Sequence, residues 1–266
     1  MNVIALSPFD IGLAAGLVVS LAGVVWAQRL ALAKPLLIAA LRAMLQLGLI
    51  GLVLQILFSS LHPGLIALVA AFMLAVAGYE VMSRQQRRLA GWWGYAVGAV
   101  AMFVSSFSVA ILALVVMVQP EPWYAPQYAI PLLGMLLGNT MTGIALGLDR
   151  LTQGLWRERA QIEARLALGE AWYEASAGVR HEAVRSALTP IINTMAAAGV
   201  VSLPGMMTGQ ILGGSPPMEA VKYQILILFL IAAGTGFGAL GAVHMAARRV
   251  FDERQRLRLE RLKAKL

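Results

Sequence analysis

Cysteine is absent from the 266-residue sequence, and histidine occurs only three times. Without thiols the chain forms no disulfide, thiolate metal site or cysteine nucleophile. So few histidines also argue against a histidine-built zinc centre. A G-x-x-x-x-G-K-[ST] motif is missing as well, which excludes ATP binding by a P-loop within this chain. These absences argue against an enzyme and leave the metal ligands of any metal-handling function unknown.

Charge is scarce too. Charged residues make up 13% of the chain and hydrophobic residues 59%, whereas soluble domains carry about 25% charged residues. The net charge of +8 is confined to short linkers and the C-terminal tail. This distribution favours orientation in a lipid bilayer over nucleic-acid binding. The first basic residue, Arg29, follows the first apolar run, which predicts a retained first span with its N-terminus outside.

What remains is a series of apolar runs, each close to the roughly 20 residues that cross a bilayer. The linkers between them alternate between basic and non-basic without exception, which sets their orientation. The sequence therefore predicts an all-α polytopic membrane protein with seven transmembrane helices, the N-terminus outside and the C-terminus in the cytoplasm. The runs are Phe9–Gln28, Pro35–Phe58, Gly64–Met82, Trp92–Val118, Tyr128–Leu148, Pro190–Leu212 and Val221–Ala247.

Four regions follow from this pattern: spans one to five (residues 1–148), a polar cytoplasmic segment (149–189), spans six and seven (190–247) and a basic tail (248–266). Charged residues three or four apart in the polar segment predict two amphipathic helices with a bend near Ala177 and Gly178. The tail is predicted to be a basic helix, which either orients the chain or binds a membrane surface or partner.

The sixth run, "NTMAAAGVVSLPGMMTGQILGG", is interrupted by Pro204 and Gly205. Proline removes a backbone donor, and irregular backbone is tolerated in a bilayer only inside protein or along a wet cavity. We therefore expect a substrate path here, although a packing kink filled by methionines is an alternative. A re-entrant hairpin is a further alternative, but it would place the charged tail outside. The path candidates are Asn193, Pro204, Gly205, Met206, Met207, Thr208 and Gln210.

Few other polar groups lie within the apolar runs. Ionisable residues inside spans are functional candidates by default, and Arg42 and Glu80 qualify, with Glu80 four residues before Arg84. Gln46 and Asn139 are uncharged candidates. No carboxylate lies near the middle of a span, which argues against a proton-driven carrier. The glycines of "GTGFGALG" are assigned to close helix packing because no strand precedes them.

The segment "LALGEAWYEASAGVRHEAVRSALTPIINTMAAAGVVSLPGMMTGQILGGSPPMEAVKYQILILFLIAA" resembles the core of the FetB-type ABC transporter permeases, bacterial iron exporters with plant relatives linked to aluminium tolerance. The likeness extends more loosely over the earlier spans. It implies a permease in the bacterial inner membrane, paired with a separate cytoplasmic ATPase that binds ATP and magnesium. It also implies a homodimer that exports iron or a related metal.

By this resemblance the polar segment is the coupling element that docks on the ATPase. Candidate docking residues are Glu170, Ala171, Glu174, Ala175, Gly178, Arg180 and Arg185. An ordinary solvated helix is the alternative for this segment. A stand-alone secondary transporter or channel, for a metal or a small organic solute, is the alternative for the whole chain.

Overall fold

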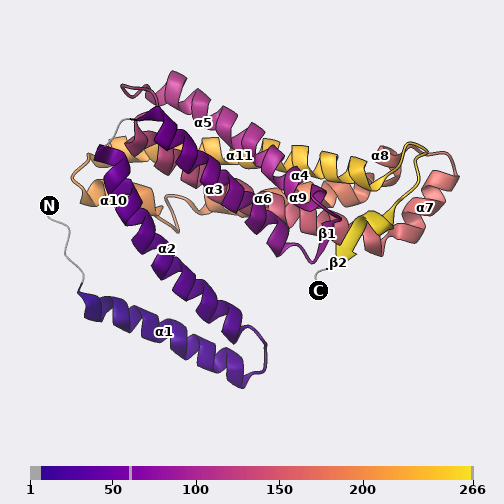
Figure 1. The fold of residues 1–266 in the computed structure, drawn as a ribbon, viewed down its shortest axis with the longest axis horizontal. Coiled ribbons are helices and arrows are strands. Elements are labelled where there is room, and N and C mark those ends of the chain that lie inside the picture. The colour runs from indigo at the N-terminus through magenta and orange to yellow at the C-terminus, as the bar shows by residue number, and fades with distance from the viewer. Residues whose placement is uncertain (1–6, 60–61, 265–266) are drawn as a thin grey trace. The chain divides into compact units, whose positions relative to one another are not determined.

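The computed structural model describes residues 7–59 and 62–264. Within these residues the regular secondary structure is helical apart from one short ribbon of two strands (Figure 1). It forms two compact units, one of residues 1–61 and 210–215 and the other of residues 62–209 and 216–266. The all-α polytopic class predicted from the sequence is confirmed.

The first unit contains two helices, α1 (Pro8–Ala27) and α2 (Ala33–Ser59). Ser7 and Asp10 form a capping box at the start of α1, in which each side chain accepts a hydrogen bond from the backbone N–H of the other. Only 6% of the α1 window and none of the α2 window is buried. Such exposed, uniformly apolar helices are expected to face lipid.

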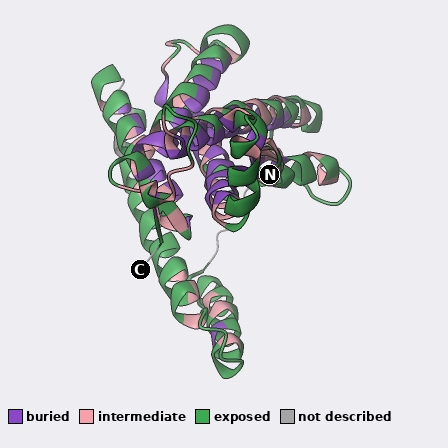
Figure 2. Ribbon diagram, turned by 90° about the vertical axis from the view of Figure 1, so that its right-hand side faces the viewer, coloured by how far each residue is buried: buried purple, intermediate pink, exposed green. Residues whose placement is uncertain are grey.

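The second unit is a bundle of helices with its buried residues gathered where they meet (Figure 2). Its spanning helices are α3 (Pro63–Arg84), a composite helix, α6 (Pro126–Arg157) and α11 (Pro217–Val250), with α9 (Ala177–Ala197) packed against α6 and α11. The composite helix consists of α4 (Trp93–Met102), a π-helical turn η1 (Phe103–Phe107), α5 (Ser108–Leu112) and a second π-helical turn η2 (Ala113–Val118).

Close packing within this bundle depends on small residues. A side chain at Gly143 of α6 would clash with the Thr235 side chain of α11, and one at Gly98 of α4 would meet Val81 of α3 at 2.8 Å. Small residues allow the spanning helices to approach each other closely.

The helices of the second unit alternate in direction. The backbone N–H of Gln86, just after α3, donates to Asp149 in the last part of α6 at 2.7 Å. Trp172, just before α9, contacts His244 and Phe251 at the end of α11. The segments that follow α3, α6 and α11, which carry the basic residues, therefore lie together. We call this end of the second unit the basic end, and its placement in the cytoplasm stays a prediction.

Six helices of the described chain are long and apolar enough to cross a membrane, and they match six of the seven predicted runs. The run predicted as the sixth span is divided. Helix α9 stops at Ala197, residues 198–204 are not helical, and α10 covers only Gly205–Leu212. At 1.5 Å per residue an eight-residue helix is about 12 Å long, too short to cross a bilayer alone.

The polar segment differs in detail from its prediction. Helix α6 continues through Arg157, then α7 (Arg159–Ala167) and the short α8 (Trp172–Ala175) follow before α9 begins at Ala177. The sharper interruption is at Gly169, whose φ of 95° is a conformation that glycine adopts readily. The predicted bend near Ala177 coincides with the α8–α9 junction.

The basic tail is not a helix, contrary to the prediction. Helix α11 ends at Val250, and residues 251–258, which we call the tail loop, fold back through a bridge between Phe251 and Leu257. A single turn η3 (Leu259–Arg261) leads to strand β2 (Leu262–Ala264), which pairs antiparallel with β1 (Arg87–Leu89). The buried pair Leu89 and Leu262 explains why the tail packs rather than extending into solvent.

Candidate coupling site and transport path

The short helix α8 lies at the centre of the basic end because Trp172 is buried there. The Trp172 ring centroid is 5.7 Å from the rings of both His244 and Phe251. The guanidinium carbons of Arg180 and Arg248 lie 5.4 and 6.0 Å from the same centroid. Aromatic pairs and cation–π contacts of this kind each contribute about 0.5–1.5 kcal/mol. We call these five side chains the Trp172 cluster.

The tail loop attaches to the same point through the backbone. The backbone N–H of Trp172 donates to Oε1 of Gln255 at 2.8 Å. The first N–H groups of any α-helix have no acceptor within the helix, and the tail side chain supplies one for Trp172. Trp172 is recognisable in the sequence only as an apolar position within an otherwise charged segment, and no signal points to Gln255 as its partner.

Asp252 organises the tail loop. Its carboxylate accepts hydrogen bonds from the backbone N–H groups of Arg254 and Arg256, and from the side chains of Arg256 and Arg258 at 2.8 and 2.9 Å. The backbone N–H of Arg256 is the largest cause that holds the pKa of Asp252 well below its usual range, and the two arginine side chains add to it. Desolvation opposes this shift without reversing it.

Arg261 and Thr152 connect the two strands of the ribbon to the ends of the spanning helices. Nη1 of Arg261 donates to the backbone oxygens of Arg249 and Phe251 at 2.7 and 3.2 Å. The hydroxyl of Thr152 donates to the backbone oxygen of Arg87 at 2.8 Å, which ties β1 to α6. The ends of α3, α6 and α11 are therefore connected through one ribbon.

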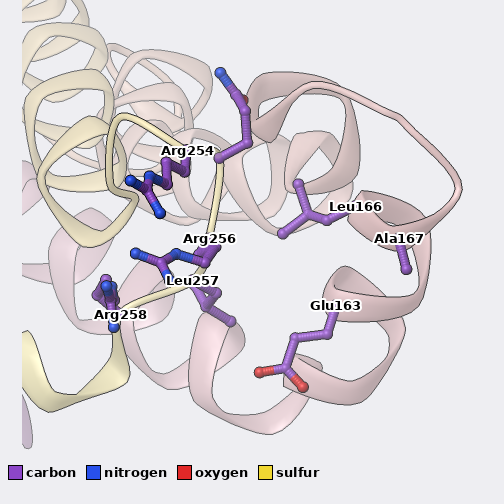
Figure 3. Close-up of a pocket in the computed structure, with 8 residues that line it drawn as sticks. Glu163, Leu166, Ala167, Arg254, Arg256, Leu257 and Arg258 are labelled. Carbon is purple, nitrogen blue, oxygen red and sulfur yellow. The ribbon is translucent and has the colours of Figure 1, made fainter.

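An open groove of about 450 Å³ separates α7 from the tail loop. Figure 3 shows Glu163, Leu166 and Ala167 on α7, opposite the tail loop with its labelled arginines. Its lining combines apolar and basic groups, so it suits a partner that presents both apolar and acidic side chains.

The predicted docking residues divide into two sets. Glu174, Gly178 and Arg185 are exposed, whereas Ala175 is buried and Ala171 and Arg180 are half-buried. Glu170 is half-buried and pairs with Arg165 at 2.6 Å. Glu174 accepts the backbone N–H of Ala171 at 3.2 Å, so it also caps α8.

The predicted path residues surround the break between α9 and α10. Helix α9 ends because Gly199 adopts a φ of 82°, and the N–H groups of Val201 and Ser202 both donate to the oxygen of Ala197. This glycine-based termination comes before Pro204, so the break begins earlier than the sequence predicted. Thr208 donates to the oxygen of Pro204 at 3.2 Å, while Met207 and Gln210 are half-buried and Gly205 and Asn193 are exposed.

Met206 also shows where the break lies along the bundle. It lines a cavity of about 70 Å³ with Val118, Tyr128 and Tyr223. These belong to the end of η2 and the starts of α6 and α11, opposite the basic end. The break therefore lies at that end rather than at the middle of the bundle.

The remaining polar candidates are placed separately. Glu80 pairs with Arg84 at 3.8 Å, as their spacing predicts. The Asn139 amide donates to the oxygen of Met135 on its own helix at 2.8 Å. Arg42 and Gln46 are exposed on α2. No group of three or more histidine, cysteine, aspartate or glutamate side chains that could hold a metal is found in the described ranges 7–59 and 62–264.

Comparison with known proteins gives matches over nearly the whole chain. A family model described as Uncharacterised protein family (UPF0014) matches residues 8–251. A UPF0014 membrane protein of Synechocystis is 38% identical, over 93% of this chain and 95% of its own. The Probable iron export permease protein FetB of Escherichia coli is 31% identical over 90% of each chain. Protein ALUMINUM SENSITIVE 3 of Arabidopsis thaliana is 32% identical over 87% of this chain and 84% of its own. No solved structure matches.

Proposed function

Because this chain belongs to the Uncharacterised protein family (UPF0014), we propose that it is the membrane permease subunit of an ABC exporter in the bacterial inner membrane. It moves iron or a related metal out of the cytoplasm as a homodimer. A separate cytoplasmic ATPase with its own ATP and magnesium supplies the energy. The similarity to the Probable iron export permease protein FetB of Escherichia coli supports the permease role and the iron cargo.

The observation that carries the proposal is the attachment of α8 to α11. A permease without a nucleotide site needs a surface that receives force from its partner and transmits it to the spanning helices. Trp172 and Gln255 fix α8 to the end of α11, a helix of 34 residues. Helix α9 follows α8 after one residue and leads to the break at residues 198–204. A displacement of α8 therefore has a continuous route to the path candidates.

The uncharged groups of the path candidates are weak metal ligands, and weak binding suits an exporter. Within the described residues the path offers amide, carbonyl and thioether groups, without a carboxylate or imidazole cluster. Oxygen ligands bind divalent cations weakly when uncharged, and Met206 and Met207 add softer contacts. A cargo that must be released outside is better served by such a site than by a tight one.

The test is purification of the tagged chain from native membranes in mild detergent, followed by mass spectrometry of the proteins that co-purify. We expect a stoichiometric subunit with a P-loop, whose ATP hydrolysis rises in the presence of this chain. Reconstituted vesicles then report the cargo through iron accumulation that depends on ATP. Isolation of the chain without a nucleotide-binding subunit would overturn the ABC assignment and favour a stand-alone carrier.

A further inference from the structure

A basic pocket of about 410 Å³ lies beside the end of α11 and the start of α4. Three arginines line it, Arg248 and Arg249 of α11 and Arg261 of η3. Trp93, the first residue of α4, lines it as well, and the guanidinium carbon of Arg249 is 4.8 Å from the centroid of the Trp93 ring. We call this cavity the arginine pocket.

The positive charge of the arginine pocket is only partly balanced by the protein. None of its three arginines forms an ion pair with a carboxylate of the described residues. Two carboxylates also line the pocket, and one of them, Asp252, is already bonded to Arg256 and Arg258. The other, Glu253, is exposed. Because a cavity lined mainly by one sign of charge attracts ions of the opposite sign, the pocket suits an anion.

The arginine pocket lies where two spanning helices end. Trp93 is the first residue of one candidate span, and Arg249 is the last but one residue of another. Tryptophan and arginine are the residues that anchor the ends of spanning helices at the level of the lipid headgroups. Basic pockets between spanning helices at this level bind the headgroups of anionic lipids.

An apolar groove of about 520 Å³ adjoins the arginine pocket, and Met245 lines both. The groove runs between the composite helix, with Val104 and Leu112, and α11, with Phe237. At 1.5 Å per residue, the stretch of α11 from Phe237 to Arg249 is about 18 Å long. Half of the hydrocarbon core of a bilayer is about 15 Å thick. The groove therefore has the length and the polarity that suit an acyl chain of one leaflet.

A charged pocket next to an apolar groove is complementary to an amphiphile. A free phosphate ion would use only the pocket, and an acidic segment of a soluble protein would not reach a groove between spanning helices. We propose that the arginine pocket and the apolar groove together bind one anionic phospholipid. Its phosphate lies at Arg248 and Arg249, and an acyl chain lies against Met245 and Phe237. The site extends beyond the proposed transport function and does not depend on it.

Native mass spectrometry of the detergent-purified full chain tests the headgroup. Dioleoyl phosphatidylglycerol is the anionic probe, and dioleoyl phosphatidylcholine is the uncharged control with the same chains. We expect one phosphatidylglycerol to be retained per chain, in preference to phosphatidylcholine. Arg249→Gln should weaken phosphatidylglycerol binding about fivefold, the effect of one basic residue near an anionic headgroup. Arg88→Gln, at an exposed residue of the basic end that does not line the pocket, is the matched control and leaves binding unchanged.

Gly241→Leu tests the groove. Gly241 lines the groove, and a side chain there would meet no atom within 4 Å, so leucine occupies the groove without a clash. This variant should bind phosphatidylglycerol less tightly although every arginine is kept. Gly48→Leu, at an exposed position of α2 with equal space, is the control and should bind normally. Normal binding by Gly241→Leu overturns the proposal. Loss of dimers without loss of lipid also overturns it, because the groove would then be an interface between two copies.

Two further results would contradict the headgroup assignment. Equal retention of the two lipids, or equal loss of binding in Arg88→Gln and Arg249→Gln, would show a general attraction to the basic end. Displacement of the lipid by excess inorganic phosphate would identify a site for a free anion. A cryo-EM map of the unaltered protein in phosphatidylglycerol nanodiscs is a measurement that needs no variant to fold. We expect elongated density from Arg249 along the groove to Phe237, and an empty groove overturns the proposal.

Discussion

The backbone N–H of Trp172 donates to the side chain of Gln255, a residue 83 positions later in the chain. This one bond joins the first residue of α8 to the tail that follows α11. It places the tail among the parts of the protein that fix the proposed ATPase-docking segment.

Gln255→Ala removes the acceptor of the Trp172 N–H. A hydrogen bond of this kind contributes about 1 kcal/mol, so the chain should still insert and fold. The tail loop should open more often, and trypsin should cleave after Arg254 and Arg256 faster than in the unaltered protein. Gln161→Ala on the exposed face of α7 is the control. Equal cleavage rates in the two variants would contradict the role of Gln255.

Trp172→Ala empties the centre of the Trp172 cluster. Substitution of a buried tryptophan by alanine costs about 3–5 kcal/mol, so the unfolding temperature should fall markedly. Trp172→Phe, which keeps an aromatic ring against His244 and Phe251, should recover part of the loss. Thermal unfolding of the purified variants measures both, and an unchanged temperature for Trp172→Ala would show that the cluster contributes little.

Glu174 combines an exposed carboxylate with a capping role, and two variants separate them. Glu174→Gln keeps an acceptor for the N–H of Ala171, whereas Glu174→Lys removes the acceptor and reverses the charge. If the charge docks on the partner, both variants reduce stimulation of ATP hydrolysis, and lysine reduces it more. Full stimulation by the glutamine variant would limit Glu174 to capping α8.

Pro204→Ala changes the junction between the non-helical residues 198–203 and α10 while Gly199 still ends α9. We expect normal membrane insertion and reduced transport, because the substitution loosens the backbone at the proposed path. Gly199→Ala is the matched variant, since alanine is strained at a φ of 82°. Normal iron export by both variants, measured in reconstituted vesicles, would assign the break to packing alone.

The contribution of Asp252 to the stability of the tail loop is expected to depend on pH. Its pKa is depressed in the folded protein by the N–H of Arg256 and by two arginine side chains. Its contribution to stability is therefore full above the ordinary aspartate pKa of about 4, and it is lost as pH falls below that value towards the depressed pKa. Asp252→Asn should lower stability at pH 7, and the difference from the unaltered protein should shrink below pH 4. A difference that is independent of pH would exclude this role.

The sequence predicted the spanning helices well because composition alone specifies them. A span such as α2 is predominantly apolar whatever it faces, so length and hydropathy identify the helix. The alternation of basic linkers likewise predicted which segments meet, and the contact of Gln86 with Asp149 agrees with it. The interruption of the sixth run was also predicted, although Gly199 rather than Pro204 ends the helix.

The tail was mispredicted because its structure depends on partners distant in sequence. Residues 251–264 have helical composition, but Leu262 is buried against the bundle only by pairing with Leu89. No local pattern reveals that pairing. For the same reason the roles of Trp172 and Gln255 were not predicted, since each depends on a partner far away in the sequence.

The β1–β2 ribbon also imposes an order on biosynthesis. The chain grows from its N-terminus, so the loop after α3 is made long before its partner strand exists. While the chain from α4 to α11 is being made, Leu89 has no strand to cover it. Only the emergence of residues 262–264 completes the basic end. A nascent chain that has made α11 is therefore still unfinished at the basic end, where we propose that the ATPase docks, and we expect docking to wait for residues 262–264.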